Sequence, residues 1–346
     1  MPGNRRLRRR FANAKGLIIH LFSGNSDSGK EWRKGWPSGV EVVTLDPKEN
    51  PKMDLNNCSV WSYVCHLVRT CRVIAIVGGP PCRSISRLRS IQPGPPPLRG
   101  RVDQRYGLLD LSPADQAKTD YDSALVLKQL ALHQLAEESR VGGVTYEGSR
   151  HEGAGNSEGP SVGFLMESPE DPARYAQEHD APTYWSWPEL TQFMEEHGMT
   201  LIHFDQGRFG HTQRKPTTCM SNLPFMDQLN EARCTVPKGE PLNPDLGSRL
   251  QQTASWADWA PGLKQAIRVA IMALIKEHGL GGEHLRKAFS MDQWRQHILQ
   301  GHRPFRRDCR ACVLDMAADK PHRRRVGRGE SSWSMGVDVV PLVIKQ

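Results

Sequence analysis

The sequence lacks two features that would direct the chain to or across a membrane. No apolar run approaches the length of about 20 residues that a membrane-spanning helix needs. The first residues are rich in arginine, yet they are not followed by the apolar segment that completes a secretory signal. We therefore expect neither a membrane segment nor a secretory signal, and a transit peptide remains the alternative interpretation of these arginines.

Cysteine is also scarce and irregularly placed. The chain of 346 residues has eight cysteines, and only Cys309 and Cys312 form a close C-x-x-C pair. This spacing is unlike the disulfide framework of a small secreted protein. We expect a reducing, intracellular compartment, with the nucleus among the candidates.

Acidic residues are outnumbered by basic ones. Lysine and arginine total 46 against 38 aspartates and glutamates, which gives a formal net charge of +8. Much of this excess lies in NRRLRRR at residues 4–10, within a predicted basic arm at residues 1–14, and in PHRRRVGRGE at residues 321–330. A basic balance favours an anionic partner, and we expect DNA or RNA.

Alternating strand and helix patterns predict the fold class. Continuous apolar runs, typical of buried strands, occupy residues 16–22, 40–46, 72–79, 162–167 and 199–205. Helical spacing of apolar residues occupies residues 60–69, 112–140, 187–198 and 261–279. Buried strands that alternate with helices indicate an α/β protein with a doubly wound, Rossmann-like parallel sheet.

Changes in composition divide the chain into segments. The α/β pattern covers residues 15–278 and is interrupted by a polar, glycine-rich stretch at residues 141–160, which we predict to be a flexible insertion. Beyond about residue 280 the sequence is basic and poor in strand signals. We therefore place a second, small module at residues 279–330, and residues 331–346 begin like another strand.

Four predicted strands end in residues suited to ligand binding or catalysis. The first ends in LFSGNSDSG from Leu21, the second in Asp46, the third in GGPPC with Cys82, and a later one in Glu167. Each feature alone also fits a plain turn, a helix N-cap, a buried cysteine or a loop acid. Ligands of open parallel sheets bind beyond the carboxyl ends of the strands, so the four features together favour a site.

The order of these motifs over about residues 16–278 resembles that of the cytosine-5 DNA methyltransferases. LFSG is similar to their first motif, which lies along the methionine half of S-adenosylmethionine. Asp46 matches their ribose-binding acid, and Asp54 in KMDL matches the acid near the adenine amine. The resemblance implies a methyltransferase-type sheet and S-adenosylmethionine as cofactor, bound by Phe22, Gly24, Asp46 and Asp54.

The same resemblance implies three catalytic roles. GGPPC is similar to the nucleophile motif, MES to the Glu-Asn-Val motif, FGHTQRKPTT to the Gln- and Arg-rich motif, and WAPGLKQAIRVAIMAL to the last motif. Cys82 would add to C6 of a flipped-out cytosine, which makes C5 able to accept a methyl group. Glu167 would bind N3 and the exocyclic amine of the base, and Arg214 would support the thiolate and the nucleotide.

Several positions depart from that family. Ser26 replaces the second glycine of the first motif, Arg83 replaces the glutamine after the nucleophile, and Ser168 replaces the asparagine after the glutamate. Only the short segment from Leu223 to Leu250 stands where the family keeps a target-recognition domain. Two interpretations therefore stay open, an active cytosine-5 methyltransferase and a catalytically lapsed nucleic-acid-binding fragment of a retrotransposon polyprotein; a different cysteine enzyme, such as a hydrolase, is a third.

The basic module contains a metal-ligand pattern. His297, His302, Cys309 and Cys312 are spaced H-x4-H-x6-C-x2-C, and a set of two nitrogen and two sulfur ligands suits tetrahedral zinc. The plainer alternative is a surface histidine pair beside two free thiols. A segment with so little apolar sequence would need the metal in order to fold.

This module resembles the zinc-binding segment that precedes the integrase core in retroelement polyproteins. WSMGVDVVPL then resembles the first strand of such a core, with Asp338 in the place of its catalytic aspartate. The rest of the core does not follow, so no integrase activity is expected from this chain.

Zinc content tests the metal assignment. Replacing Cys309 with serine should lower the zinc content of the purified chain, because a thiolate ligand is lost. Cys71→Ser, which changes a cysteine outside the pattern, is the control and should keep its zinc. Equal zinc contents in Cys309→Ser and the unaltered chain would remove the assignment.

Overall fold

The computed structural model describes residues 5–24, 26–90, 94–141, 160–175, 178–211, 214–233, 258–280 and 296. The chain divides into two compact units, residues 1–291 and 292–346, and every element below belongs to the first. The predicted insertion, apart from its two end residues, lies outside the described residues. So do all four predicted zinc ligands and the integrase-like strand.

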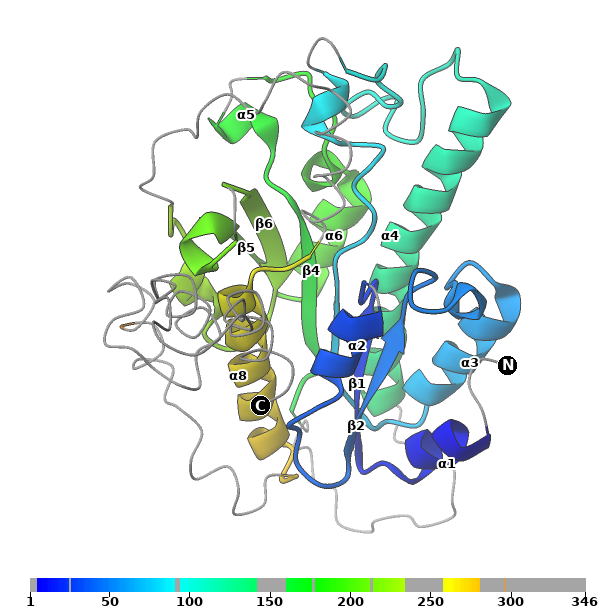
Figure 1. Ribbon diagram of the computed structural model, residues 1–346, viewed down its shortest axis with the longest axis vertical. Helices are drawn as coiled ribbons and strands as arrows, with labels where there is room; N and C mark the ends of the chain where they lie inside the picture. Colours follow the sequence, from blue (N-terminus) through cyan, green and yellow to red (C-terminus); the bar gives the residue numbers. More distant parts are fainter. Residues whose placement is uncertain are drawn as a thin grey trace, which may run out of the picture. The chain divides into compact units, whose positions relative to one another are not determined.

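A mixed six-stranded sheet forms the centre of this unit, in the order β2-β1-β3-β4-β6-β5 (Figure 1). Its strands are β1 (Gly16–Leu21), β2 (Val40–Leu45), β3 (Val73–Gly78), β4 (Gly163–Pro169), β5 (Thr200–Asp205) and β6 (Pro216–Ser221). The first four in spatial order are parallel, whereas β6 runs antiparallel to both β4 and β5. The α/β class is confirmed, and the expectation of a purely parallel sheet is corrected by the insertion of β6.

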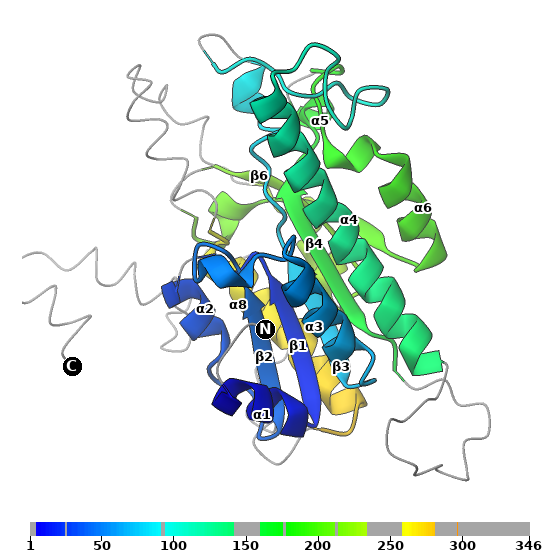
Figure 2. The same cartoon turned by 90° about the vertical axis from the view of Figure 1, so that its right-hand side faces the viewer.

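Helices cover both faces of the sheet. They are α1 (Arg5–Asn13), α2 (Ser26–Trp32), α3 (Cys58–Val68), α4 (Pro113–Val141), α5 (Pro172–Tyr175), α6 (Pro188–Glu196) and α8 (Pro261–Glu277). Figure 2 shows α4 in front of the sheet and α8 behind it. On the α8 side, the Gly163 backbone of β4 comes so near to Leu274 that a methyl group there would lie 2.4 Å from its Cδ1. This two-sided cover is compatible with a Rossmann-like fold.

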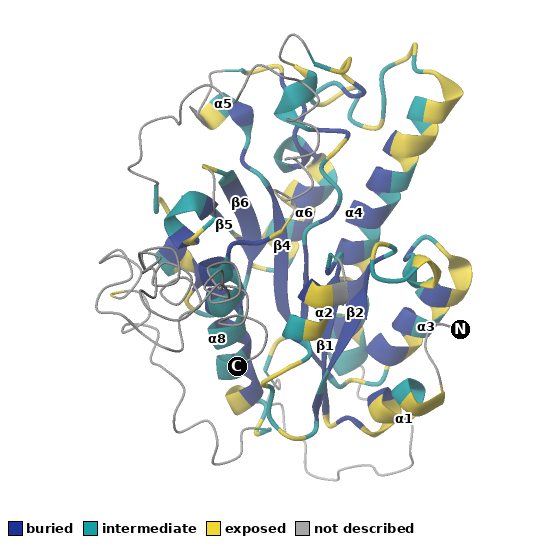
Figure 3. Cartoon of the chain, in the orientation of Figure 1, coloured by how far each residue is buried: buried dark blue, intermediate teal, exposed yellow. Residues whose placement is uncertain are grey.

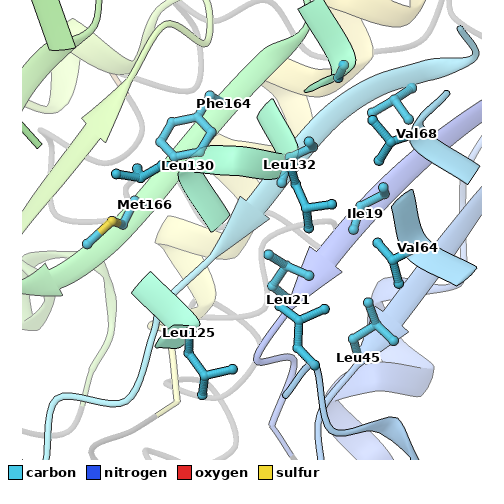
Figure 4. Packing of buried hydrophobic residues seen from close by; sticks show 14 of the residues in the cluster. Ile19, Leu21, Leu45, Val64, Val68, Leu125, Leu130, Leu132, Phe164 and Met166 are labelled. Carbon is cyan, nitrogen blue, oxygen red and sulfur yellow. The ribbon is translucent and has the colours of Figure 1, made fainter. Parts of the chain in front are cut away.

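One hydrophobic cluster joins α3, α4 and α6 to the sheet, as Figure 4 shows for its central residues. Alternate residues of β1, among them Ile19 and Leu21, point into it and meet Leu132 of α4. The intervening His20 lies outside this cluster, because successive side chains of a strand point to opposite faces. Figure 3 shows the result: the inner strands are almost entirely buried, the edge strand β5 is partly exposed, and the outer surfaces of the helices are exposed.

The predicted basic arm contains a docked helix, α1. Leu7 packs against the hydrophobic cluster and Phe11 is buried within it. Arg72 caps the carboxyl end of α1, because its Nη1 donates to the carbonyls of Phe11 (3.2 Å), Ala12 (2.7 Å) and Ala14 (2.6 Å). A cation at the carboxyl end of a helix complements its dipole, so α1 is held by tertiary contacts in spite of its charge.

Candidate active site

The carboxyl ends of β1, β2, β3 and β4 lie at one edge of the sheet. The register pairs Leu21 with both Leu45 and Gly78, and Gly78 with Met166. The segments that follow these residues carry Phe22, Gly24, Asp46, Cys82 and Glu167. The parallel pairing thus brings five of the seven residues predicted for catalysis and cofactor binding to one edge.

Gly79 lets the end of β3 approach Glu167 closely. A methyl group at this position would lie 2.7 Å from Oε2 of Glu167 and 3.3 Å from Nε1 of Trp259. No real Cβ tolerates the shorter of these distances, and both neighbours are buried. The second glycine of GGPPC, Gly79, is therefore required by the packing of the carboxylate.

The loop that carries Cys82 is fixed from several sides. The hydroxyl of Tyr184 donates to the carbonyl of Pro81 at 2.6 Å, and Nε of Arg89 donates to the carbonyl of Arg83 at 2.7 Å. Two consecutive prolines restrict the backbone before Cys82. The thiol is half-buried on this rigid loop, which is the arrangement that a positioned nucleophile needs.

Arg83 anchors the same loop to helix α4. Its guanidinium pairs with Asp122, with Nη2 3.0 Å from Oδ1, and lies 5.5 Å from the centre of the Tyr121 ring. Asp122 is fully buried, so loss of Arg83 would leave a buried charge without its ion-pair partner. The departure from the family at residue 83 thus has a structural role here.

Three donors hold the carboxylate of Glu167, which is only 6% exposed. Gln206, in the short 3-10 helix η4 (Gln206–Phe209), donates its Nε2 to Oε1 at 2.9 Å. Nζ of Lys215, just before β6, lies 3.3 Å from the same oxygen. Nε1 of Trp259, just before α8, donates to Oε2 at 3.1 Å. We call Glu167 with Gln206, Lys215 and Trp259 the Glu167 cluster.

Trp259 is itself held in place by contacts with two other aromatic rings. Its ring centre lies 5.3 Å from that of His20 on β1 and 6.0 Å from that of Trp32 on α2. Burial lowers the pKa of His20 to about 3, so this imidazole is neutral and acts as an aromatic surface. The indole N–H is thereby aimed at Glu167 by packing alone.

The Cys82 thiol is shifted towards its protonated form. Burial raises its pKa, the nearby Glu167 carboxylate raises it further, and Lys215 lowers it. A thiolate at neutral pH therefore needs either the loss of the negative charge on Glu167 or an additional positive charge. The protonation of Cys82 thus depends on the charge of Glu167.

Arg214 does not supply that additional charge, because Asp205 binds it. Its Nε donates to Oδ2 of Asp205 at 3.0 Å, and Oδ1 of the same residue accepts from the backbone of Gly207 and Lys215, each at 2.9 Å. The Gln- and Arg-rich segment therefore directs Lys215, the next residue, to Glu167. Arg214 and Lys215 immediately precede β6, and their side chains reach different carboxylates, those of Asp205 and Glu167.

The predicted cofactor residues form a strained turn beside Asp46. Phe22 and Gly24 both have left-handed backbone angles, with φ of 56° and 81°, which only glycine adopts freely. Asp46 accepts hydrogen bonds from the backbone N–H of Gly24 at 2.9 Å and of Lys48 at 2.7 Å. Strain of this kind gathers at ligand sites.

The hydroxyl of Ser23, in the middle of this turn, is buried and has no hydrogen-bond partner among the described residues. Burial also raises the pKa of the adjacent Asp46, although the two backbone donors oppose the shift. An unpartnered hydroxyl beside a buried acid fits a polar ligand such as an amino-acid or ribose group.

Asp54 lies beyond the end of β2 and is already partnered. It accepts from the backbone N–H of Asn56 at 2.8 Å and makes a hydrogen bond with Tyr121. Burial, reinforced by this bond, raises the pKa of Tyr121 to about 12, so its hydroxyl stays protonated and donates. Tyr121 connects the predicted adenine acid to Arg83 of the nucleophile loop.

The described residues contain no cluster of three or more histidines, cysteines or acids that could hold a metal ion. Within those same residues, no helix is long and apolar enough to cross a membrane. The predicted zinc ligands lie outside the described residues, so the zinc prediction stays a prediction.

The pH dependence of Cys82 alkylation tests its coupling to Glu167. Iodoacetamide reacts with the thiolate, so the midpoint of the rate profile should lie above the ordinary cysteine pKa. Glu167→Gln should lower this midpoint because a negative charge is removed, and Lys215→Gln should raise it. Mass spectrometry can follow Cys82, with exposed Cys58 as an internal reference that stays constant between variants. Equal midpoints in all three proteins would contradict the coupling.

No protein-family model matches this chain, and no curated protein is significantly similar to it.

Proposed function

We propose that this protein is a methyltransferase-type protein that acts on cytosine in nucleic acid and uses S-adenosylmethionine. The observation that carries the proposal is geometric: Cys82 and Glu167 lie at the ends of the adjacent parallel strands β3 and β4, where the backbone of Gly79 packs against the Glu167 carboxylate. A nucleophilic thiol and an acid that binds the ring edge are the two groups that attack at C6 of cytosine requires.

The arrangement of the sheet supports a methyltransferase-type fold. The parallel strands are followed by β6, which runs antiparallel between β4 and β5, and such a reversed strand is typical of the methyltransferase-type sheet. β6 also has a direct effect on the site, because Lys215 of the Glu167 cluster immediately precedes it and Thr217 within it accepts a hydrogen bond from Gln206 at 3.1 Å. The net charge of +8 supports nucleic acid as the substrate class.

The residues of the Glu167 cluster have distinct tasks in this proposal. Gln206 and Trp259 hold the carboxylate in one orientation, so that Glu167 can accept from the exocyclic amine of the base. Lys215 lowers the pKa of Cys82 and so favours the thiolate that adds to C6. The rigid Pro-Pro backbone keeps the sulfur in position for attack on a flipped-out base.

The turn after β1 fits the proposed cofactor. S-adenosylmethionine would be held by Phe22, Gly24 and Asp46. The hydroxyl of Ser23, which has no hydrogen-bond partner among the described residues, supplies a further polar group there. Asp54 would join them on exchange of its bond to Tyr121. When bound, S-adenosylmethionine supplies the methyl group.

A catalytically lapsed, nucleic-acid-binding protein is the second candidate, and one observation favours it. Arg214 is bound to Asp205, so the guanidinium expected beside the thiol is engaged elsewhere. Calorimetry with S-adenosylmethionine separates the two candidates, because the enzyme must bind it. Absence of binding at millimolar ligand would favour the lapsed protein. The residues that carry the retrotransposon resemblance lie outside those described.

A covalent trapping experiment tests the chemistry. DNA that contains 5-fluorocytosine should form an adduct with the chain in the presence of S-adenosylmethionine, and Cys82→Ser should abolish it. Cys219→Ala is the matched control, because Cys219 is buried beside Glu167 on β6 and its thiol pKa is likewise raised by burial and by Glu167. An adduct that persists in Cys82→Ser, or none with the unaltered chain, would refute catalysis through Cys82.

A further inference from the structure

A basic groove lies at the amino ends of β1 and β2, whereas the candidate active site lies at the carboxyl ends of the strands. It has a volume of about 570 Å³ and is lined by Arg5, Arg6, Arg9 and Arg10 of α1 and by Glu41 of β2. α1 precedes the first residue of β1, and Glu41 is the second residue of β2, so the groove borders the amino ends of these strands. Cys82, in contrast, follows the carboxyl end of β3.

The sequence of α1 places these four arginines on one side of the helix. At 3.6 residues per turn, positions 5, 6, 9 and 10 fall within an arc of about 140°. Leu7 and Phe11 point to the other side and pack against the hydrophobic cluster. The arginine side is therefore fixed towards solvent by the burial of the apolar side.

Three of the four arginines have no ion-pair partner among the residues that the structure describes. Arg10 pairs with Glu41, with Nη2 2.5 Å from Oε2. Arg5, Arg6 and Arg9 are exposed and make no ion pair among the described residues. α1 also has no acidic residue in its first turn, where the helix dipole disfavours cations and favours anions.

We propose that this arginine groove binds the phosphate backbone of a nucleic acid, as a second contact surface separate from the Cys82 site. Guanidinium groups bind phosphate oxygens in a bidentate manner. Arg5 and Arg9 are about 6 Å apart along the helix axis, so both guanidinium groups can reach phosphates of the same strand. A bound phosphate would relieve both the repulsion between neighbouring arginines and the unfavourable charge at the amino end of α1.

The packing of α1 argues against a lipid surface as the partner. An amphipathic helix that lies on a membrane inserts its apolar side into the bilayer. In α1 that side is already occupied, because Phe11 is only 5% exposed and lies in the protein core. The groove itself offers charge and no large apolar side chain, which suits a sequence-independent contact with a polyanion.

The salt dependence of binding to a 20-base-pair DNA duplex tests this proposal with the full chain. Replacing Arg5, Arg6 and Arg9 together with glutamine should weaken binding and reduce the slope of log K against log salt by about 2 to 3, because each phosphate contact contributes about 0.9. The variant with glutamine at Lys52, Lys118 and Lys276 is the matched control. It loses the same charge from exposed positions outside the groove and should keep most of the slope.

Thermal unfolding provides a second measurement. All three replaced arginines are exposed, so the groove variant should unfold at nearly the temperature of the unaltered chain. Added duplex should raise the unfolding temperature of the unaltered chain more than that of the variant. Equal salt slopes for the groove and control variants would overturn the proposal. It would also be overturned if only binding to phosphatidylserine vesicles, and not to DNA, depended on the three arginines. Neither result bears on the Cys82 chemistry.

Discussion

The burial of one carboxylate, that of Glu167, organises the carboxyl edge of this sheet. An unpaired charge in a protein interior is very costly, so its partners must be present for the fold to be stable. These partners are Gln206, Lys215 and Trp259, which come from three separate segments, and Gly79 adds a fourth by leaving room for the carboxylate. Burial raises the pKa of Cys82, and the same Glu167 carboxylate around which these segments gather raises it further.

Much of the fold could be predicted from the sequence because its parallel strands are continuous apolar runs. The strand β6 could not, since PTTCMS begins with proline and has little apolar character. Its burial results from pairing with β4 on one side and β5 on the other, which is a tertiary effect. Similarly, nothing local indicated that Arg72 would cap α1 from about 60 residues away and turn a basic arm into a docked helix.

The candidate site was predictable where a residue directly follows a strand, as Asp46 and Cys82 do, because parallel pairing brings such positions together. It was less predictable where the partner of a charge decides its role. Arg214 and Lys215 are adjacent cations, and only the position of the buried Asp205 determines which one turns towards Glu167. Both cations immediately precede β6, a strand that the sequence did not reveal, so their directions could not be predicted.

The insertion of β6 has a consequence for how the protein is made. β4 and β5 lie on either side of β6 and do not pair with each other, although both precede it in the chain. During synthesis the edge of β4 that pairs with β6 therefore stays unpaired until residue 221 has left the ribosome. The hydrogen bond from Trp259 to Glu167 can form only after a further stretch of chain has been made. Open strand edges promote association between chains, so the interval before β6 arrives is when a nascent chain most needs protection by chaperones.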